Sequence, residues 1–298
     1  MVHRPLFADV ADVSARLGAA GYLADEATAT TVFLADRLGK PLLVEGPAGV
    51  GKTELAKAVS AATSAELIRL QCYEGIDEAR ALYEWNYRKQ LLRIQAAGVD
   101  GGTGAGKAPS WDALHDDIFS DEFLLARPLL AAIRRTEPTV LLVDETDKAD
   151  LEVEALLLEV LSDFQVTVPE LGTIVAERRP FVLLTSNASR ELSEALKRRC
   201  LYLHLDYPDA EREVRIVLTR APEVPAQIAE QVVKAVRTLR AAELKKAPSI
   251  SETLDWARTL VALGVDGLDE ATARATLGVV VKHSSDVGRA ASALGLVS

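Results

Sequence analysis

Short apolar runs alternate with segments of helical periodicity through the first two thirds of this chain. In the helical segments, at 9–19 and 25–38 for example, apolar residues recur every three or four positions. The apolar runs are continuous instead, as is typical of strands buried on both faces of a parallel sheet. The predicted strands are 42–45, 67–70, 140–143, 181–185 and 201–205. This alternation predicts an α/β fold, with a five-stranded parallel sheet between helices.

The pattern changes after Pro208, because no convincing strand follows it. Only helical spacing remains. The predicted helices are 209–220, 225–244, 251–263, 269–282 and 284–294. We therefore predict two domains, an α/β domain over residues 1–208 and an all-α domain, called the lid below, over residues 209–298.

Two segments depart from the simple alternation. Residues 74–97 predict one long amphipathic helix that ends at a glycine-rich stretch. Residues 164–178 carry Val and Thr at alternate positions around the turn formers at 169–172. This predicts a β-hairpin inserted between a helix at 151–163 and the strand at 181. At its tip, Leu171 is expected either to be exposed at a contact or to pack on a neighbouring helix.

The octapeptide GPAGVGKT follows the first predicted strand directly and opens a helix. It fits the GxxxxGK[ST] pattern of a phosphate-binding P-loop in its required setting of strand, loop and helix. Gly46 and Gly51 let the backbone fold around an anion, and the helix adds the positive end of its dipole. Lys52 is expected at the β- and γ-phosphates, and the Thr53 hydroxyl at Mg²⁺. The predicted ATP-binding residues are Gly46, Pro47, Ala48, Gly49, Val50, Gly51, Lys52, Thr53 and Glu54.

A second glycine-rich stretch, GGTGAGK at 101–107, satisfies only part of that pattern. Position 108 is alanine, so the metal-binding hydroxyl is missing. No apolar strand precedes the stretch, and Pro109 opposes helix continuation. We therefore predict a flexible loop over 98–110, with Lys107 in solvent.

Polar residues end the third and fourth predicted strands. The run VLLVDE places Asp144 to hold Mg²⁺ through water and Glu145 to act as a general base on the attacking water. Asn187 is placed to hydrogen-bond the γ-phosphate or to orient the water, although Asn is also common in such turns. A strand that ends in Asp-Glu is weak evidence alone, but it gains weight when a P-loop precedes it in the same sheet.

Composition limits the classes of partner. The net charge of −10 disfavours nonspecific binding to nucleic acid. Two isolated cysteines and four scattered histidines show neither a disulfide framework nor metal-ligand spacing. We expect no membrane span, because no apolar stretch reaches 18 residues, and no signal peptide, so a cytoplasmic location is predicted.

Together these motifs resemble those of an AAA+ ATPase. The segment VDETDKADLEVEALLLEVLSDFQVTVPELGTI, followed by PFVLLTSN, is similar to the MoxR branch and within it to the CoxD-like subgroup. The resemblance implies a ring, usually hexameric, with a chaperone-like role in enzyme maturation or metal and cofactor insertion. It further implies a von Willebrand factor A domain partner and, as client, a molybdenum hydroxylase of the carbon monoxide dehydrogenase type.

The resemblance also assigns residues. Asn187 matches the sensor 1 position, and Arg199, with Arg198 as the alternative, matches the arginine finger that enters a neighbouring subunit's site. A basic residue at a helix C-terminus is also favourable through the helix dipole alone. Family members commonly carry a sensor 2 arginine near the start of a lid helix, but 247–252 contains none, and Arg258 comes later.

Two other functions compete with an ATP-driven remodeller of a client enzyme. The first is a DNA-acting AAA+ ATPase of the initiator or helicase-loader type, which the acidic balance disfavours. The second is an inactive nucleotide-binding scaffold. Lys52, Glu145 and Asn187 are all present, so nothing in the sequence indicates lost catalysis.

Overall fold

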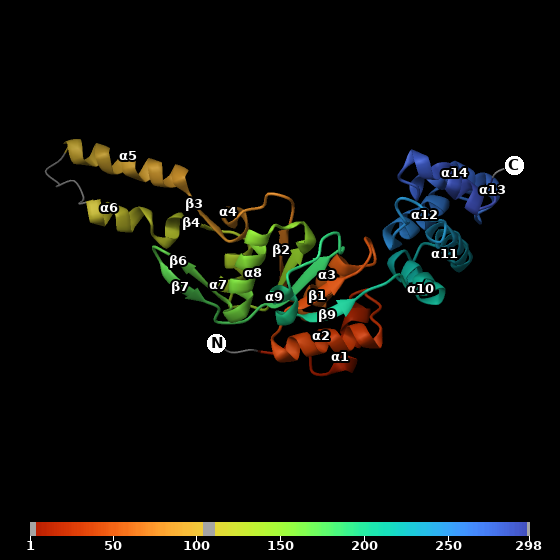
Figure 1. The fold of residues 1–298 in the computed structure, drawn as a ribbon, viewed down its shortest axis with the longest axis horizontal. Coiled ribbons are helices and arrows are strands. Elements are labelled where there is room, and N and C mark those ends of the chain that lie inside the picture. Colours follow the sequence, from red (N-terminus) through yellow and green to blue (C-terminus); the bar gives the residue numbers. More distant parts are fainter. Residues whose placement is uncertain (1–3, 104–110, 297–298) are drawn as a thin grey trace. The chain divides into compact units, whose positions relative to one another are not determined.

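A five-stranded parallel sheet forms the centre of the α/β part of the chain (Figure 1). The computed structural model describes residues 4–103 and 111–296. The strand order is β2-β5-β8-β1-β9, so all five predicted strands are confirmed. Their bounds are Leu42–Glu45 (β1), Glu66–Gln71 (β2), Thr139–Asp144 (β5), Phe181–Ser186 (β8) and Leu201–His204 (β9).

The apolar runs form strands because both of their faces are covered. Every residue of β5 and β8, the second and third strands in sheet order, is buried. The helices of this part are amphipathic or short, and each buries an apolar face. They are Val10–Ala19 (α1), Glu26–Leu38 (α2), Lys52–Thr63 (α3), Pro128–Arg134 (α7), Leu151–Asp163 (α8) and Glu194–Arg199 (α9).

The register of the sheet aligns the ends of four neighbouring strands. Glu45 of β1 pairs with Ser186 of β8, and Gln71 of β2 pairs with Asp144 of β5. Because the pairing of these strands is parallel, their carboxyl ends lie at one edge of the sheet. Ligands of open α/β sheets bind at that edge.

The predicted helix at 74–97 is wrong. The segment contains a one-turn helix α4 (Glu78–Ala81), a strand β3 (Tyr83–Trp85) and the start of α5 (Tyr87–Thr103). β3 pairs antiparallel with β4 (Leu124–Ala126), which lies about forty residues later. Aromatic residues at 83 and 85 favour a strand once this partner is present. Local periodicity contains no information about such a partner.

α5 extends into the predicted loop. It continues to Thr103, so the loop prediction is wrong for 98–103, while 104–110, including Lys107, lie outside the described residues. α6 (Trp111–Ile118) follows, and a 3-10 turn at Asp121–Phe123 leads into β4. α5 and α6 lie beside each other and join the rest of the fold through β3 and β4 (Figure 1).

The inserted hairpin is confirmed. β6 (Gln165–Val168) pairs antiparallel with β7 (Gly172–Val175). Val166 and Val168 are buried against α7 and α8, whereas Thr167 and Thr173 face solvent with their hydroxyl oxygens 3.3 Å apart. Leu171 is half-buried and packs against the same core. Of the two expectations for Leu171, the structure therefore shows packing.

The chain divides into two compact units that are discontinuous in sequence. The first contains Met1–Arg16, Asp25–Glu45 and Ala56–Leu203, and the second contains Leu17–Ala24, Gly46–Leu55 and His204–Ser298. The second unit thus combines the P-loop with the C-terminal helices. The domain boundary at Pro208 remains a prediction.

The C-terminal helices pack around Trp256, which is fully buried. The predicted helix at 269–282 is wrong beyond Thr276, where a 3-10 turn at Leu277–Val279 replaces it, and the helix predicted at 225–244 ends at Arg240. The C-terminal helices are Ala210–Arg220 (α10), Ala226–Arg240 (α11), Ile250–Ala262 (α12), Glu270–Thr276 (α13) and Ser284–Ala293 (α14).

In the described residues, no helix is long and apolar enough to cross a membrane.

Candidate functional site

The P-loop connects β1 to α3 and folds as a tight, glycine-dependent turn. Gly46, Gly49 and Gly51 all have positive φ angles, of 156°, 74° and 100°. Gly49 also approaches α12 closely, since a Cβ placed on it would overlap the Ser249 side chain. The backbone N–H of Ile250 donates to the Gly49 carbonyl over 3.2 Å. Position 49 therefore requires glycine both for its conformation and for its contact.

Lys52 lies beneath this loop. Its Nζ donates to the carbonyl oxygens of Gly46 at 2.7 Å and of Pro47 at 2.8 Å, and the residue is 7% exposed. The loop thus encloses a buried ammonium group next to its own backbone, which is the arrangement that a polyphosphate would meet. Glu54, also predicted to contact the nucleotide, pairs with Arg220 of α10 at 2.9 Å.

Asp144 ends β5 as a buried carboxylate with a partner on each oxygen. The Thr185 hydroxyl of β8 donates to Oδ1, and the Arg69 guanidinium of β2 donates to Oδ2, both at 2.5 Å. The Thr185 oxygen also accepts the backbone N–H of Glu145 at 2.9 Å. Neighbouring strands on both sides of β5 therefore hold this carboxylate in place.

Glu145 has an unusual backbone. Its φ of 55° and ψ of 47° are left-handed, a conformation that costs a non-glycine residue free energy and that clusters at functional sites. Its Oε2 accepts from Gln71 Nε2 at 3.1 Å and pairs with Lys148 Nζ at 2.8 Å. The hydrogen bond to Glu145 raises the pKa of Lys148, so this ammonium stays charged. The left-handed turn directs the chain away from the sheet directly after Asp144.

Asp147 connects the acidic strand end to the Asn187 loop. It accepts the backbone N–H of Asn187 at 3.2 Å and of Ser189 at 3.0 Å, and the Ser189 hydroxyl at 2.5 Å. Burial raises the pKa of Asp147, but these hydrogen bonds outweigh burial and the net shift is downward. Arg190 and Ser193 lie further along the Asn187 loop, and both contact Glu154 of α8. Arg190 pairs with the Glu154 carboxylate at 2.5 Å, and the Ser193 N–H donates to it at 2.9 Å.

The two finger candidates end α9. Arg199 donates to the Leu158 carbonyl of α8, whereas Arg198 is 82% exposed and lies 3.9 Å from Glu194. In the lid, Arg258 pairs with Glu223 at 3.1 Å and donates to the Arg220 carbonyl. Arg258 is the lid arginine that could have replaced a sensor 2 arginine, and its side chain makes these two contacts within the lid.

Asp144 is chemically suited to Mg²⁺, because it is a buried carboxylate and Mg²⁺ prefers oxygen ligands. The Thr53 hydroxyl of the P-loop stays a predicted ligand. In the described part of the chain, no three His, Cys, Asp or Glu side chains gather into a metal cluster. Mg²⁺ in nucleotide enzymes needs no such cluster, because phosphate oxygens and water complete its shell.

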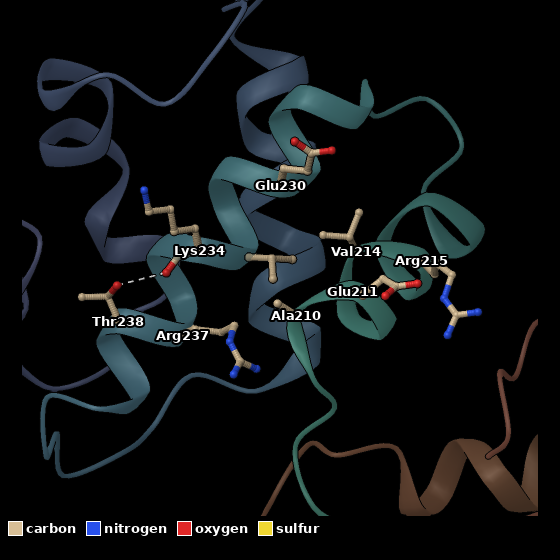
Figure 2. A pocket seen from close by; sticks show the side chains of 9 residues that line it. Ala210, Glu211, Val214, Arg215, Glu230, Lys234, Arg237 and Thr238 are labelled. Carbon is tan, nitrogen blue, oxygen red and sulfur yellow. Dashed lines mark hydrogen bonds between the residues drawn. The ribbon is translucent and has the colours of Figure 1, made fainter. Parts of the chain in front are cut away.

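A separate groove of about 670 Å³ lies between α10 and α11 in the lid (Figure 2). Val214 lies on its surface, with Glu211 and Arg215 on one side and Glu230 and Lys234 on the other. None of the predicted ATP-binding or hydrolytic residues lines it.

Comparison with known families decides the class of the protein. The model of the AAA domain, dynein-related subfamily, matches residues 41–200, which is more than half of the chain. The chain belongs to this AAA domain family. The match runs from the strand before the P-loop to the end of α9, so it includes the P-loop and the acidic run that ends β5. AAA domains are nucleotide-hydrolysing modules that typically assemble into rings.

Relatives of this AAA protein include chaperones. An uncharacterized protein of Staphylococcus haemolyticus is 27% identical over 76% of this chain and 77% of its own length. Chaperone protein ClpB 2 of Parasynechococcus marenigrum is 35% identical over 48% of this chain, and the Clp protease ATP-binding subunit ClpL of Lactococcus lactis is 32% identical over 49%. The aligned parts cover only 13% and 16% of those two Clp proteins.

The AAA fold is also supported by solved structures. A mutant of RuvB from Thermotoga maritima is similar with a TM-score of 0.50 and 16% identity, over 99% of this chain and 86% of that one. At this identity the likeness concerns the fold alone.

Several residues of this AAA site were not predicted from the sequence. Asp147 and Lys148 lie in the segment that carried the MoxR resemblance, yet no role was assigned to them. Arg69 and Gln71 lie on an unremarkable strand, and only its pairing with β5 brings them to the acids. Their alternation, two positions apart on β2, places both side chains on one face and could have indicated a shared role.

Proposed function

We propose that this AAA domain binds ATP at the P-loop and hydrolyses it with the acids that end β5. The sheet order carries the proposal. β5, β8 and β1 are adjacent, so Asp144 and Glu145, Asn187 and the P-loop all follow carboxyl ends of neighbouring strands. In AAA proteins, and in open α/β sheets generally, nucleotides bind at that edge.

Each residue has a distinct role in this proposal. Lys52 faces the β- and γ-phosphates, as P-loop lysines do. Thr53 and Asp144 would hold Mg²⁺, which supplies positive charge to the phosphate oxygens. Glu145 takes a proton from the attacking water, and Asn187 orients that water or the γ-phosphate.

We further propose a MoxR-type role of the CoxD-like kind, in which a ring of this chain remodels a client enzyme. The Clp relatives support a protein client, because their names describe a chaperone and the ATP-binding subunit of a protease. The acidic composition also disfavours nucleic acid. The proposed partners are a von Willebrand factor A domain protein and a molybdenum hydroxylase of the carbon monoxide dehydrogenase type. Affinity capture with a Glu145→Gln variant tests this, since slow hydrolysis retains the client; enrichment of DNA instead would favour an initiator or helicase loader.

Arg199→Ala is expected to bind ATP normally but to hydrolyse it poorly, because the proposed finger acts in the neighbouring subunit's site. Mixing it with Lys52→Ala should restore part of the activity. A Lys52→Ala subunit can offer its intact Arg199 to the intact P-loop of an Arg199→Ala subunit. The measurement is phosphate release across mixing ratios.

The control for the mixing experiment is Arg198→Ala, because Arg198 is the more exposed of the pair and the alternative finger. Mixed rings are first verified by native mass spectrometry. If verified mixed rings of Arg199→Ala and Lys52→Ala recover no activity, the trans role of Arg199 is refuted. If Arg198→Ala is the variant that loses hydrolysis and recovers it on mixing with Lys52→Ala, the finger is Arg198.

Thr173→Glu is expected to leave basal ATP hydrolysis near wild type and to reduce client maturation. We propose that the inserted hairpin takes part in coupling to the client. Thr173 faces solvent on it and contacts the Thr167 hydroxyl, so the charge changes the surface that a client could touch, whereas Leu171 and its packing are retained. The measurements are ATP turnover and client activity in cells. Thr219→Glu on α10 is the matched control. Unchanged client activity would remove the hairpin from client coupling.

A further inference from the structure

The side chain of Arg69 on β2 forms an ion pair with Asp144, the carboxylate that is proposed to hold Mg²⁺. Gln71 and Asp144 are paired across β2 and β5, so the Arg69 side chain, two positions earlier, lies on the same face as that of Gln71. The guanidinium donates to Asp144 Oδ2 at 2.5 Å. The Asp144 side chain is only 4% exposed, whereas that of Arg69 is 50% exposed. The carboxylate is therefore fixed, and the cation can leave toward solvent.

The same guanidinium is linked to Glu145. Arg69 also donates to Gln71 Oε1, and Gln71 Nε2 donates to Glu145 Oε2 at 3.1 Å. One continuous set of side chains thus connects the proposed metal ligand to the proposed base. Release of Arg69 from Asp144 would also alter the hydrogen bonding of Gln71.

We propose that Arg69 competes with Mg²⁺ for Asp144 and thereby sets the Mg²⁺ concentration that nucleotide binding requires. The inference rests on the proposed ATP function and concerns the same site. Thr185 holds Oδ1 and Arg69 holds Oδ2, so a metal or a metal-bound water on this carboxylate would share it with the guanidinium.

The test is a Mn²⁺ titration of the full chain with a non-hydrolysable ATP analogue, with free Mn²⁺ measured by electron paramagnetic resonance. Arg69→Gln is expected to bind Mn²⁺ about two- to fivefold more tightly than wild type. This factor corresponds to the free energy that a half-exposed ion pair typically contributes. Arg69→Lys keeps the charge and should stay nearer to wild type. In an Asp144→Asn background, Arg69→Gln should give no gain.

Arg93→Gln is the matched control, because Arg93 has a similar exposure, 55%, and pairs with Asp117 away from the site. It should leave the Mn²⁺ affinity unchanged. Equal or weaker Mn²⁺ binding by Arg69→Gln would overturn the inference, and so would an equal gain in Arg93→Gln. If Arg69→Gln fails to fold, Arg69→Met keeps the aliphatic stem and carries the same expectation.

The proposed function and this inference fail in different ways. If wild type shows no Mn²⁺ binding that depends on both the analogue and Asp144, the proposed site is wrong. If wild type shows such binding and Arg69→Gln does not strengthen it, only the role of Arg69 is wrong.

Discussion

Glu145→Gln is expected to retain ATP binding and to lose hydrolysis by about a hundredfold or more, the usual effect of removing a positioned general base. The amide has the same shape and still offers an oxygen to Lys148 and Gln71, which contact Oε2 of the native carboxylate. It cannot take a proton from water. The left-handed backbone at 145 is retained, because the substitution does not alter the Cβ.

The measurements are phosphate release and the affinity for a fluorescent ATP analogue on the same preparation. Glu152→Gln is the control, since it makes the same chemical change on the exposed first turn of α8. Loss of binding together with turnover would give Glu145 a structural role, and unchanged turnover would remove the general base from the proposal.

Lys52→Ala is expected to weaken ATP binding about tenfold to a hundredfold and to abolish measurable turnover at ordinary ATP concentrations. The lost ammonium makes two charge-assisted hydrogen bonds to the loop, and contacts of that kind contribute about 1.5–3 kcal/mol each. It is also the cation proposed to face the phosphates. Both the loop conformation and the ligand would therefore lose their partner.

Calorimetry of ATP binding checks this result. Lys57→Ala is the control, because it removes an exposed lysine from the same helix. Wild-type affinity and turnover in Lys52→Ala would contradict the P-loop assignment. A drop in thermal stability without a drop in affinity would limit Lys52 to holding the loop.

The sheet could be predicted from the sequence because its strands are continuous apolar runs whose burial is required on both faces. β3 and β4 could not, since each has three residues and forms only through pairing with the other across α5 and α6. The hairpin lay between these cases. Its alternation was local, but the packing of Leu171 depended on the core around it, which the alternation does not describe.

The site divides in the same way. Lys52, Asp144 and Glu145 could be proposed from the sequence because their motifs are contiguous. The partners that hold them come from other strands: Thr185 is paired in the sheet with Val44, and Arg69 lies one strand away from Asp144. Such contacts depend on strand order, and a single sequence read locally does not contain that order.

The order in which the chain is synthesised gives a further meaning to the discontinuous second unit. The P-loop shares that unit with His204–Ser298. The Tyr207 hydroxyl donates to the carbonyl of Ala48 in the P-loop, although Tyr207 comes 159 residues later in the chain. At about 5–20 residues per second, ribosomes need roughly 8–30 s to reach that tyrosine after the P-loop. During this interval the loop lacks its packing partners from the lid. The nascent chain should therefore acquire nucleotide affinity only after the lid has emerged, and ribosome-bound chains stalled before residue 204 should not retain the fluorescent ATP analogue.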